Sequence, residues 1–174
     1  MKKLIATFRL LQNEVIDIVS SVTEEHYKKQ FHPDLSPIGW HLGHCIFTES
    51  YWIKNQLLEK KIADETLTSL YLPELSVKKS RGEVLPKKNK MLAWAKETQI
   101  ENYTLLDLAT TESTSHNLLI NNYLIHFLIQ HYAQHIETII MILTAIQIQN
   151  NHINFNSPKI LESYQRKQRV ITIE

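Results

Sequence analysis

Two histidines four residues apart, His131 and His135, lie within a long apolar stretch at residues 125–143. On an α-helix this spacing places both imidazoles on one face, one turn apart, so that they can share a metal ion. Apolar neighbours such as Phe127 and Leu128 predict that this face is partly buried. A buried ring nitrogen needs a hydrogen bond or a metal, because leaving it unpaired costs on the order of a few kcal/mol. The pair therefore raises the question of a third ligand.

A third histidine, His44, occupies an equivalent position on an earlier predicted helix. Trp40, His44, Phe47 and Tyr51 recur at steps of three and four residues, which predicts an aromatic, core-facing stripe with His44 in its middle. His41 lies one turn before His44 and can reach the same region. Three neutral imidazole nitrogens with no fourth protein ligand predict an open site for one divalent ion, Zn²⁺, Ni²⁺, Fe²⁺ or Mn²⁺, with room for water or substrate.

Other metal and catalytic motifs do not fit the sequence. A di-iron bundle needs Glu-x-x-His pairs, and none is present. A zincin needs H-E-x-x-H, but Tyr132 follows the first histidine of the pair. No glycine-rich phosphate loop occurs. Cys45 adjoins His44 but points about 100° away around the helix, which indicates a core residue rather than a ligand or nucleophile.

Glu137 is the only formal charge in the helix that carries His131 and His135. It is either a solvated or paired carboxylate, or a functional group that orients a histidine or relays a proton. Glu49 is a weaker candidate of the same kind. His41, His116 and His126 are by default structural or exposed.

The composition narrows the class of protein. The 174 residues predict one domain with a sizeable core. A net charge of +1 argues against a nucleic-acid binder. One cysteine excludes an internal disulfide, and with no signal peptide recognised we expect a cytoplasmic protein. The apolar runs are shorter than the roughly 20 residues of a membrane span, so no membrane association is expected.

Few glycines and prolines, together with long periodic runs, predict an all-α fold. Ser36 before Pro37 predicts a helix start with Ser36 as N-cap. The expected architecture is an up-down four-helix bundle over 1–150, with a long loop at about 61–87 and a C-terminal tail, 151–174, that packs on the bundle. The four predicted helices span 2–22, 37–60, 88–110 and 113–149.

The long loop carries much of the positive charge of the chain. Its basic residues, continuing to the start of the next helix, are Lys78, Lys79, Arg81, Lys87, Lys88 and Lys90. We interpret them mainly as a solvated charged loop. The alternative is a clamp for an anionic group of the substrate.

Four motifs in combination resemble the DinB-like superfamily, most closely the DinB-type N-terminal domain of ergothioneine-synthase-like proteins. They are S-P-I-G-W-H-L-G-H, ending at His44; H-Y-A-Q-H-I-E, from His131 to Glu137; S-R-G-E-V-L-P; and M-L-A-W-A. The resemblance covers about Leu4 to Gln149. It implies an up-down four-helix bundle, often dimeric, with a metal held by three histidines that map to His44, His131 and His135. It favours His44 over His41 as the ligand from its helix.

The resemblance also implies limits on the function. In the ergothioneine-synthase type a second, large catalytic domain completes the active site. The 174 residues are not expected to include such a domain, so we do not expect them to act alone as a complete sulfoxide synthase. Other single-domain members resemble thiol-dependent transferases or metal-dependent hydrolases. The family name refers to DNA-damage induction and implies no DNA binding.

Two hypotheses of function follow. The first is a metal-dependent transferase or hydrolase that acts on a small molecule, such as a thiol, and forms a homodimer. The second is a non-catalytic helical interaction or dimerisation module, in which the histidines are structural or a metal only stabilises the bundle. Rings that converge at an open site favour the first hypothesis, and dispersed or sealed rings favour the second.

Overall fold

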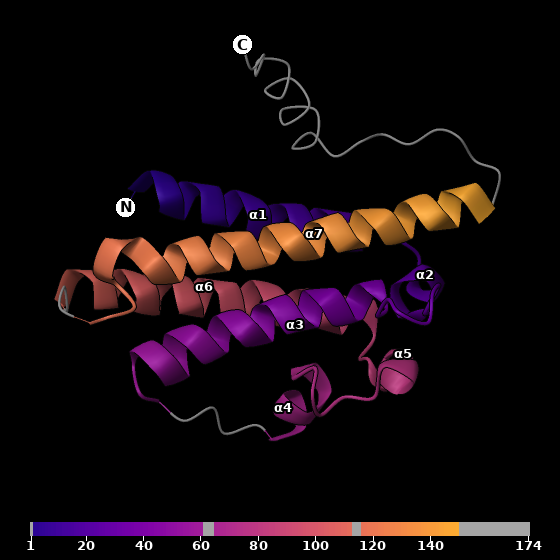
Figure 1. Ribbon diagram of the computed structural model, residues 1–174, viewed down its shortest axis with the longest axis horizontal. Helices are drawn as coiled ribbons and strands as arrows, with labels where there is room; N and C mark the ends of the chain where they lie inside the picture. The colour runs from indigo at the N-terminus through magenta and orange to yellow at the C-terminus, as the bar shows by residue number, and fades with distance from the viewer. Residues whose placement is uncertain (1, 61–64, 113–115, 150–174) are drawn as a thin grey trace, which may run out of the picture.

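The computed structural model describes residues 2–60, 65–112 and 116–149, and within these ranges all regular structure is helical (Figure 1). The α-helices are α1 (Lys2–Ser21), α2 (Glu24–Lys28), α3 (Ile38–Ser50), α4 (Glu65–Tyr71), α5 (Arg81–Val84), α6 (Lys88–Glu112) and α7 (Tyr123–Gln149). A π-helical segment, η1 (Tyr51–Leu57), continues α3, and two short 3₁₀ turns are η2 (Lys78–Ser80) and η3 (Ile120–Asn122). The predicted all-α class is confirmed.

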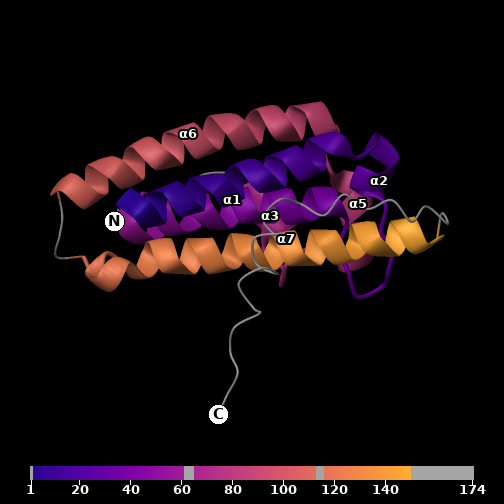
Figure 2. The ribbon, with the colours of Figure 1, turned by 90° about the horizontal axis from the view of Figure 1, so that it is seen from above.

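The four long helices α1, α3, α6 and α7 lie side by side along the molecule (Figures 1 and 2). Their directions differ from the simple alternation that we expected. α3 and α6 run the same way, opposite to α1 and α7, so the order is up-down-down-up. The physical reason is the long connection between α3 and α6, whose described residues 65–87 lie beside α3 and lead to the end of the bundle at which α6 begins. A long crossover of this kind lets consecutive helices run parallel.

α1 buries the apolar seam that its sequence predicts. Phe8, Leu11, Val15 and Ile18, followed by Val22 just after the helix ends, recur at alternating steps of three and four residues, and all are buried. This spacing keeps one stripe of the helix facing the core along its whole length. The stripe packs chiefly against α7.

Two glycines on one face of α3 admit two tyrosine rings. A Cβ atom on Gly39 would lie 2.2 Å from the ring of Tyr27, and one on Gly43 would lie 2.1 Å from the ring of Tyr71. Both distances are far below van der Waals contact. The two rings can therefore lie against the helix only because glycine has no Cβ atom. The segments that carry the two tyrosines therefore pack directly on the backbone of α3.

α3 begins differently from the predicted Ser36 cap. Pro37 occupies the N-cap position, and the Ser36 hydroxyl does not bond to the helix. It accepts a hydrogen bond from the Arg81 guanidinium instead, at 2.6 Å. Ser36 is thus used to fasten a distant segment, an interaction that sequence spacing does not reveal.

α7 starts later than the predicted residue 113. Residues 113–115 lie outside the described part, and the helix itself begins at Tyr123 after a 3₁₀ turn. Asn121 and Asn122 have φ values of 52° and 58°. This left-handed conformation cannot continue an α-helix, and asparagine tolerates it better than most residues do. The two asparagines therefore set the start of α7.

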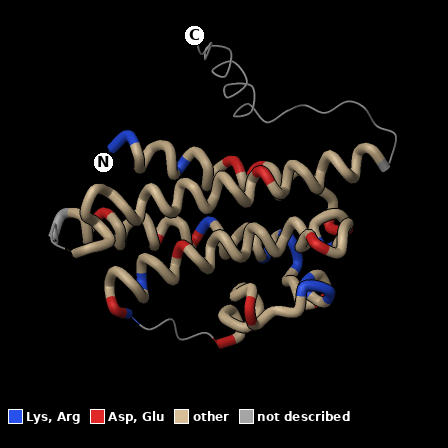
Figure 3. Tube along the Cα trace, viewed as in Figure 1, with Lys and Arg blue, Asp and Glu red and all other residues tan. Residues whose placement is uncertain are grey.

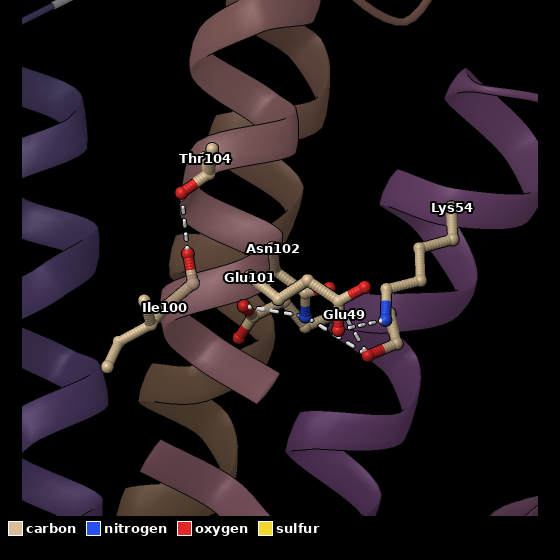
Figure 4. A network of polar contacts seen from close by, with 7 residues as sticks. Glu49, Lys54, Ile100, Glu101, Asn102 and Thr104 are labelled. Carbon is tan, nitrogen blue, oxygen red and sulfur yellow. Dashed lines mark hydrogen bonds and ion pairs between the residues drawn. The ribbon is translucent and has the colours of Figure 1, made fainter. Parts of the chain in front are cut away.

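A buried polar layer joins the four long helices at mid-length. Glu49 on α3 is completely buried and accepts hydrogen bonds from Gln12 on α1 at 2.9 Å, Asn102 on α6 at 3.0 Å and the Tyr132 hydroxyl on α7 at 2.6 Å. Figure 4 shows Glu49 and Asn102 meeting between α3 and α6, near the Lys54–Glu101 ion pair. Each helix contributes at least one polar side chain to the layer, so the layer fixes the relative register of the helices.

No described helix is long and apolar enough to cross a membrane. The predicted tail at 151–174 lies outside the described residues.

Candidate metal centre

The structure brings together the three histidines that the sequence singled out. One nitrogen from each of His44, His131 and His135 lies within 4.8 Å of the other two. The Nε2 atoms of His44 and His131 are 3.1 Å apart. The rings of His44 and His135 have centroids 4.8 Å apart, and those of His131 and His135 are 4.6 Å apart. The rings converge instead of dispersing through the core.

Two antiparallel helices position the cluster. α7 supplies His131 and His135 from consecutive turns of one face, and α3 supplies His44 from the helix packed against it. His44 is 9% exposed, whereas His131 and His135 are partly exposed. The two histidines of α7 therefore retain partial contact with solvent, whereas His44 is buried.

Aromatic rings surround the cluster. Trp40 stacks on His44 with a centroid distance of 4.8 Å and an interplanar angle of 8°. Phe127 lies almost parallel to His131 at 5.8 Å, and Trp52 in turn contacts Phe127 at 4.8 Å. These flat walls restrict how the imidazoles can rotate.

A main-chain carbonyl sets the tautomer of His44. Its Nδ1 lies 2.7 Å from the Tyr71 carbonyl oxygen, which can only accept, so Nδ1 carries the proton. The lone pair of His44 is consequently on Nε2, the atom that faces His131. This arrangement, in which the far nitrogen of a histidine bonds to a carbonyl, is common among metal-bound histidines.

The segment that provides this carbonyl is fastened to α3 by Arg81. The Arg81 guanidinium lies 3.7 Å above the ring centre of Trp40, on which His44 also stacks. It donates to the Pro73 carbonyl at 3.2 Å and to the Ser76 hydroxyl at 2.9 Å. Arg81 is 4% exposed and forms no ion pair with any carboxylate of the described residues.

This contact revises the expectation for the basic loop. Lys78, Lys79, Lys87 and Lys90 are exposed, as a solvated loop requires, and blue positions gather around η2 and α5 (Figure 3). Arg81 and Lys88 depart from this pattern. Arg81 is buried and donates to protein oxygens, and the partly buried Lys88 donates to the carbonyls of Ser20 and Val22. Charge pattern alone could not distinguish these two residues from their neighbours.

His135 has a different neighbour, His41. Their Nδ1 atoms are 2.8 Å apart, which is a hydrogen-bond distance. His41 is buried, and sequence reasoning treated it as structural by default, although its spacing from His44 allowed it to reach the site. Two further ring nitrogens, Nε2 of His41 and Nδ1 of His131, are buried and have no hydrogen-bond partner among the described residues.

Burial keeps the histidines neutral. It lowers the pKa of His131 to about 3 and that of His135 to about 2, with smaller contributions from neighbouring histidines. The pKa of His44 is also lowered, again mainly by burial. Because protonation occupies the lone pair that a metal needs, these low pKa values leave the nitrogens available at neutral pH.

The donor set fits a divalent transition metal. Two nitrogens bound to Zn²⁺ at about 2.0–2.1 Å with a tetrahedral angle lie about 3.3–3.4 Å apart, close to the 3.1 Å between the Nε2 atoms of His44 and His131. Three neutral imidazoles suit zinc, nickel, iron or copper better than the hard cations, which prefer oxygen.

The other candidates lie apart from this cluster. Glu137 is on the exposed side of α7 and forms no ion pair within the described residues, so a role as proton relay stays a prediction. Cys45 is fully buried, and burial raises the pKa of its thiol, as expected of a core residue. Glu49 belongs to the polar layer. His126 is exposed, and His116 accepts a hydrogen bond from the Leu118 amide.

Comparison with known proteins points to one family. The model of the DinB superfamily matches residues 7–139, which is most of the chain and includes all three histidines. No curated protein sequence matches the chain.

Proposed function

Because the chain belongs to the DinB superfamily, we propose that it binds one divalent metal ion through His44, His131 and His135 and uses it to act on a small molecule. Members of this superfamily bind metals in general. The observation that carries the proposal is the convergence of three neutral imidazoles within 4.8 Å of one another. In the metal-free protein Nε2 of His131 can donate a hydrogen bond to Nε2 of His44 across their 3.1 Å contact, and a bound ion would replace this hydrogen bond by taking the lone pair of each ring.

Each part of the site has a role in this proposal. His44 offers Nε2 because the Tyr71 carbonyl holds its proton on Nδ1. His131 and His135 are partly exposed, and the open coordination positions of the ion would receive a ligand on their side. A bound divalent ion supplies Lewis acidity and lowers the pKa of a bound water or thiol. Trp52 and Phe127 would exclude water from one side of the ligand.

We propose thiol transfer or hydrolysis as the reaction class. Both use a nucleophile that becomes anionic when it binds a metal. Three neutral ligands would leave the full positive charge of the ion to stabilise that anion, since the cluster includes no carboxylate from the described residues. To identify the metal and the substrate, each metal-loaded form of the protein is screened for activity on thiols and on hydrolysable esters and amides.

The second candidate, a non-catalytic dimerisation module, is favoured by the outer face of α7. Tyr123, Met141 and Ile148 are exposed there, and Glu137 is the only charged residue of the helix. A face with little charge can pack against its own copy about a two-fold axis without opposing like charges. Light scattering tests the homodimer, and a monomer at working concentrations contradicts it.

A titration of the metal-free protein with Zn²⁺ tests the metal site. We expect one ion per chain in the wild type and loss of that binding in the His131→Ala variant, because two imidazoles remain where three are needed. His126→Ala is the matched control, since His126 lies on the exposed side of the same helix. Full binding by His131→Ala would refute the ligand assignment.

A further inference from the structure

His41 is a buried histidine that the proposed ligand set does not use. It precedes His44 by one turn of α3, and it is 6% exposed. Its ring lies 5.1 Å from that of His135 on α7, with an interplanar angle of 49°. The Nδ1 atoms of the two rings are 2.8 Å apart, whereas Nε2 of His41 has no partner within the described part of the chain.

The two rings share one proton at this contact. A neutral imidazole has one N–H and one lone pair, so a 2.8 Å contact between two nitrogens requires one donor and one acceptor. If His135 donates from Nδ1, its lone pair is on Nε2 and can bind a metal. If His41 donates, Nε2 of His135 carries the proton and cannot bind. The tautomer of His41 therefore decides whether His135 is ready to act as a ligand.

We propose that His41 is a positioning residue for the metal site, which accepts a hydrogen bond from His135 Nδ1 and thereby holds Nε2 of His135 toward the metal. The inference rests on the proposed metal site. It assigns to His41 the role that the Tyr71 carbonyl has for His44. A carbonyl can only accept, whereas an imidazole can also donate, so His135 is the ligand whose orientation depends on a neighbour's proton.

His41 is not itself a fourth ligand in this arrangement. Its Nδ1 is engaged by His135, and the group of converging nitrogens consists of His44, His131 and His135 alone within the described residues. A neutral imidazole at His41 has the one lone pair that this hydrogen bond needs.

Two substitutions at His41 distinguish a role as hydrogen-bond acceptor from a role in packing alone. His41→Asn places an amide oxygen near the position of Nδ1 and retains an acceptor. His41→Leu fills a similar volume without one. His126→Asn, on the exposed side of α7, is the control for loss of a histidine. Loss of a hydrogen-bonding partner of a metal-bound histidine typically weakens metal affinity 10–100-fold.

The measurement is the Zn²⁺ affinity of each protein, determined by competition with a chromophoric chelator, together with thermal unfolding of the metal-free forms. We expect His41→Leu to bind about 10–100-fold more weakly than wild type, His41→Asn to recover most of that loss, and His126→Asn to match wild type. Unchanged affinity in His41→Leu overturns the inference. Equal losses in His41→Leu and His41→Asn also overturn it, because the role would then be one of packing.

Nuclear magnetic resonance of the wild type provides a test that needs no variant. With Zn²⁺ bound, nitrogen-15 shifts should show the His135 proton on Nδ1 and the His41 proton on Nε2. A proton on Nδ1 of His41 in the zinc form would contradict the inference while leaving the three-histidine site intact. Failure of the wild type to bind Zn²⁺ would overturn the metal site and this inference together.

Discussion

The geometry around His44 depends on a residue with no side chain, Gly43. The Tyr71 ring lies where a Cβ of Gly43 would be, and the Tyr71 carbonyl orients His44. Gly39, one turn earlier, receives the ring of Tyr27 in the same way. Gly39 and Gly43 are therefore crowded to a similar degree by a tyrosine ring. Only Gly43 is next to a tyrosine whose carbonyl orients a proposed metal ligand.

The Gly43→Ala substitution is expected to lower both stability and metal affinity. An added methyl group must displace the Tyr71 ring, which typically costs about 1–3 kcal/mol of unfolding free energy, and it shifts the carbonyl that fixes His44. Gly39→Ala is expected to lower stability by a similar amount and to leave Zn²⁺ affinity near that of wild type. Chemical denaturation and zinc titration measure the two effects. Equal zinc affinities for both variants would contradict the role of Tyr71.

At the scale of the elements, the segment from Leu70 to Arg81 acts as an outer support for α3. Trp40 donates from its indole nitrogen to the Leu70 carbonyl at 2.8 Å, and Arg81 binds the Pro73 carbonyl and the Ser36 hydroxyl. Four hydrogen bonds from one planar guanidinium, together with stacking on Trp40, explain why arginine is used.

Arg81→Lys tests this support while preserving the charge. A lysine has no planar fork and cannot reach the same acceptors, so we expect the unfolding free energy to fall by about 2–4 kcal/mol, since hydrogen bonds from a charged donor contribute roughly 1.5–3 kcal/mol each. Zinc affinity should fall as well, because the Tyr71 carbonyl is in the same segment. Lys79→Ala, an exposed neighbour, should change neither quantity. Wild-type behaviour of Arg81→Lys would show that the segment holds its position without the guanidinium.

The buried layer around Glu49 links stability to pH. Burial raises the pKa of Glu49 from 4.5 to about 7, although the hydrogen bonds from Tyr132, Gln12 and Asn102 oppose the increase. Other titratable groups near it are Cys45 on the same helix and Lys54, which forms an ion pair with Glu101. The folded state therefore binds a proton more tightly than the unfolded state does. The protonated Glu49 carboxyl therefore stabilises the fold fully below pH 4.5, and this stabilisation is lost as the pH rises to about 7.

The Glu49→Gln variant isolates this effect. Glutamine cannot ionise, so the unfolding free energy of the variant, relative to wild type, should increase by about 2 kcal/mol between pH 5 and pH 8. The histidines have low pKa values, so they favour folding as the pH rises and oppose the effect of Glu49. Because both proteins contain the same histidines, this contribution cancels in the difference between their unfolding free energies. Urea denaturation at several pH values provides the curve. A difference independent of pH would show that Glu49 titrates normally.

At the scale of the whole molecule, local periodicity predicted the helices and the proximity of the three histidines better than it predicted the topology. His44, His131 and His135 were identified because helical spacing fixes which side chains share a face, and the structure brings them together. The parallel course of α3 and α6 was not predicted, because the crossover at 58–87 contains no periodic signal for direction. Tertiary contacts also determined the roles of Arg81 and His41. Arg81 is buried and His41 contacts His135 because of segments that are distant in the sequence, so local spacing could not predict either contact.

The measurement that tests the central claim most directly is an anomalous difference map at the zinc edge, from crystals of the zinc-loaded protein. We predict one peak per chain among His44, His131 and His135, with zinc–nitrogen distances of about 2.0–2.1 Å and His41 in contact with His135 rather than with the metal. A fully loaded protein whose zinc lies elsewhere, or whose three histidines remain without metal, would contradict the proposed site.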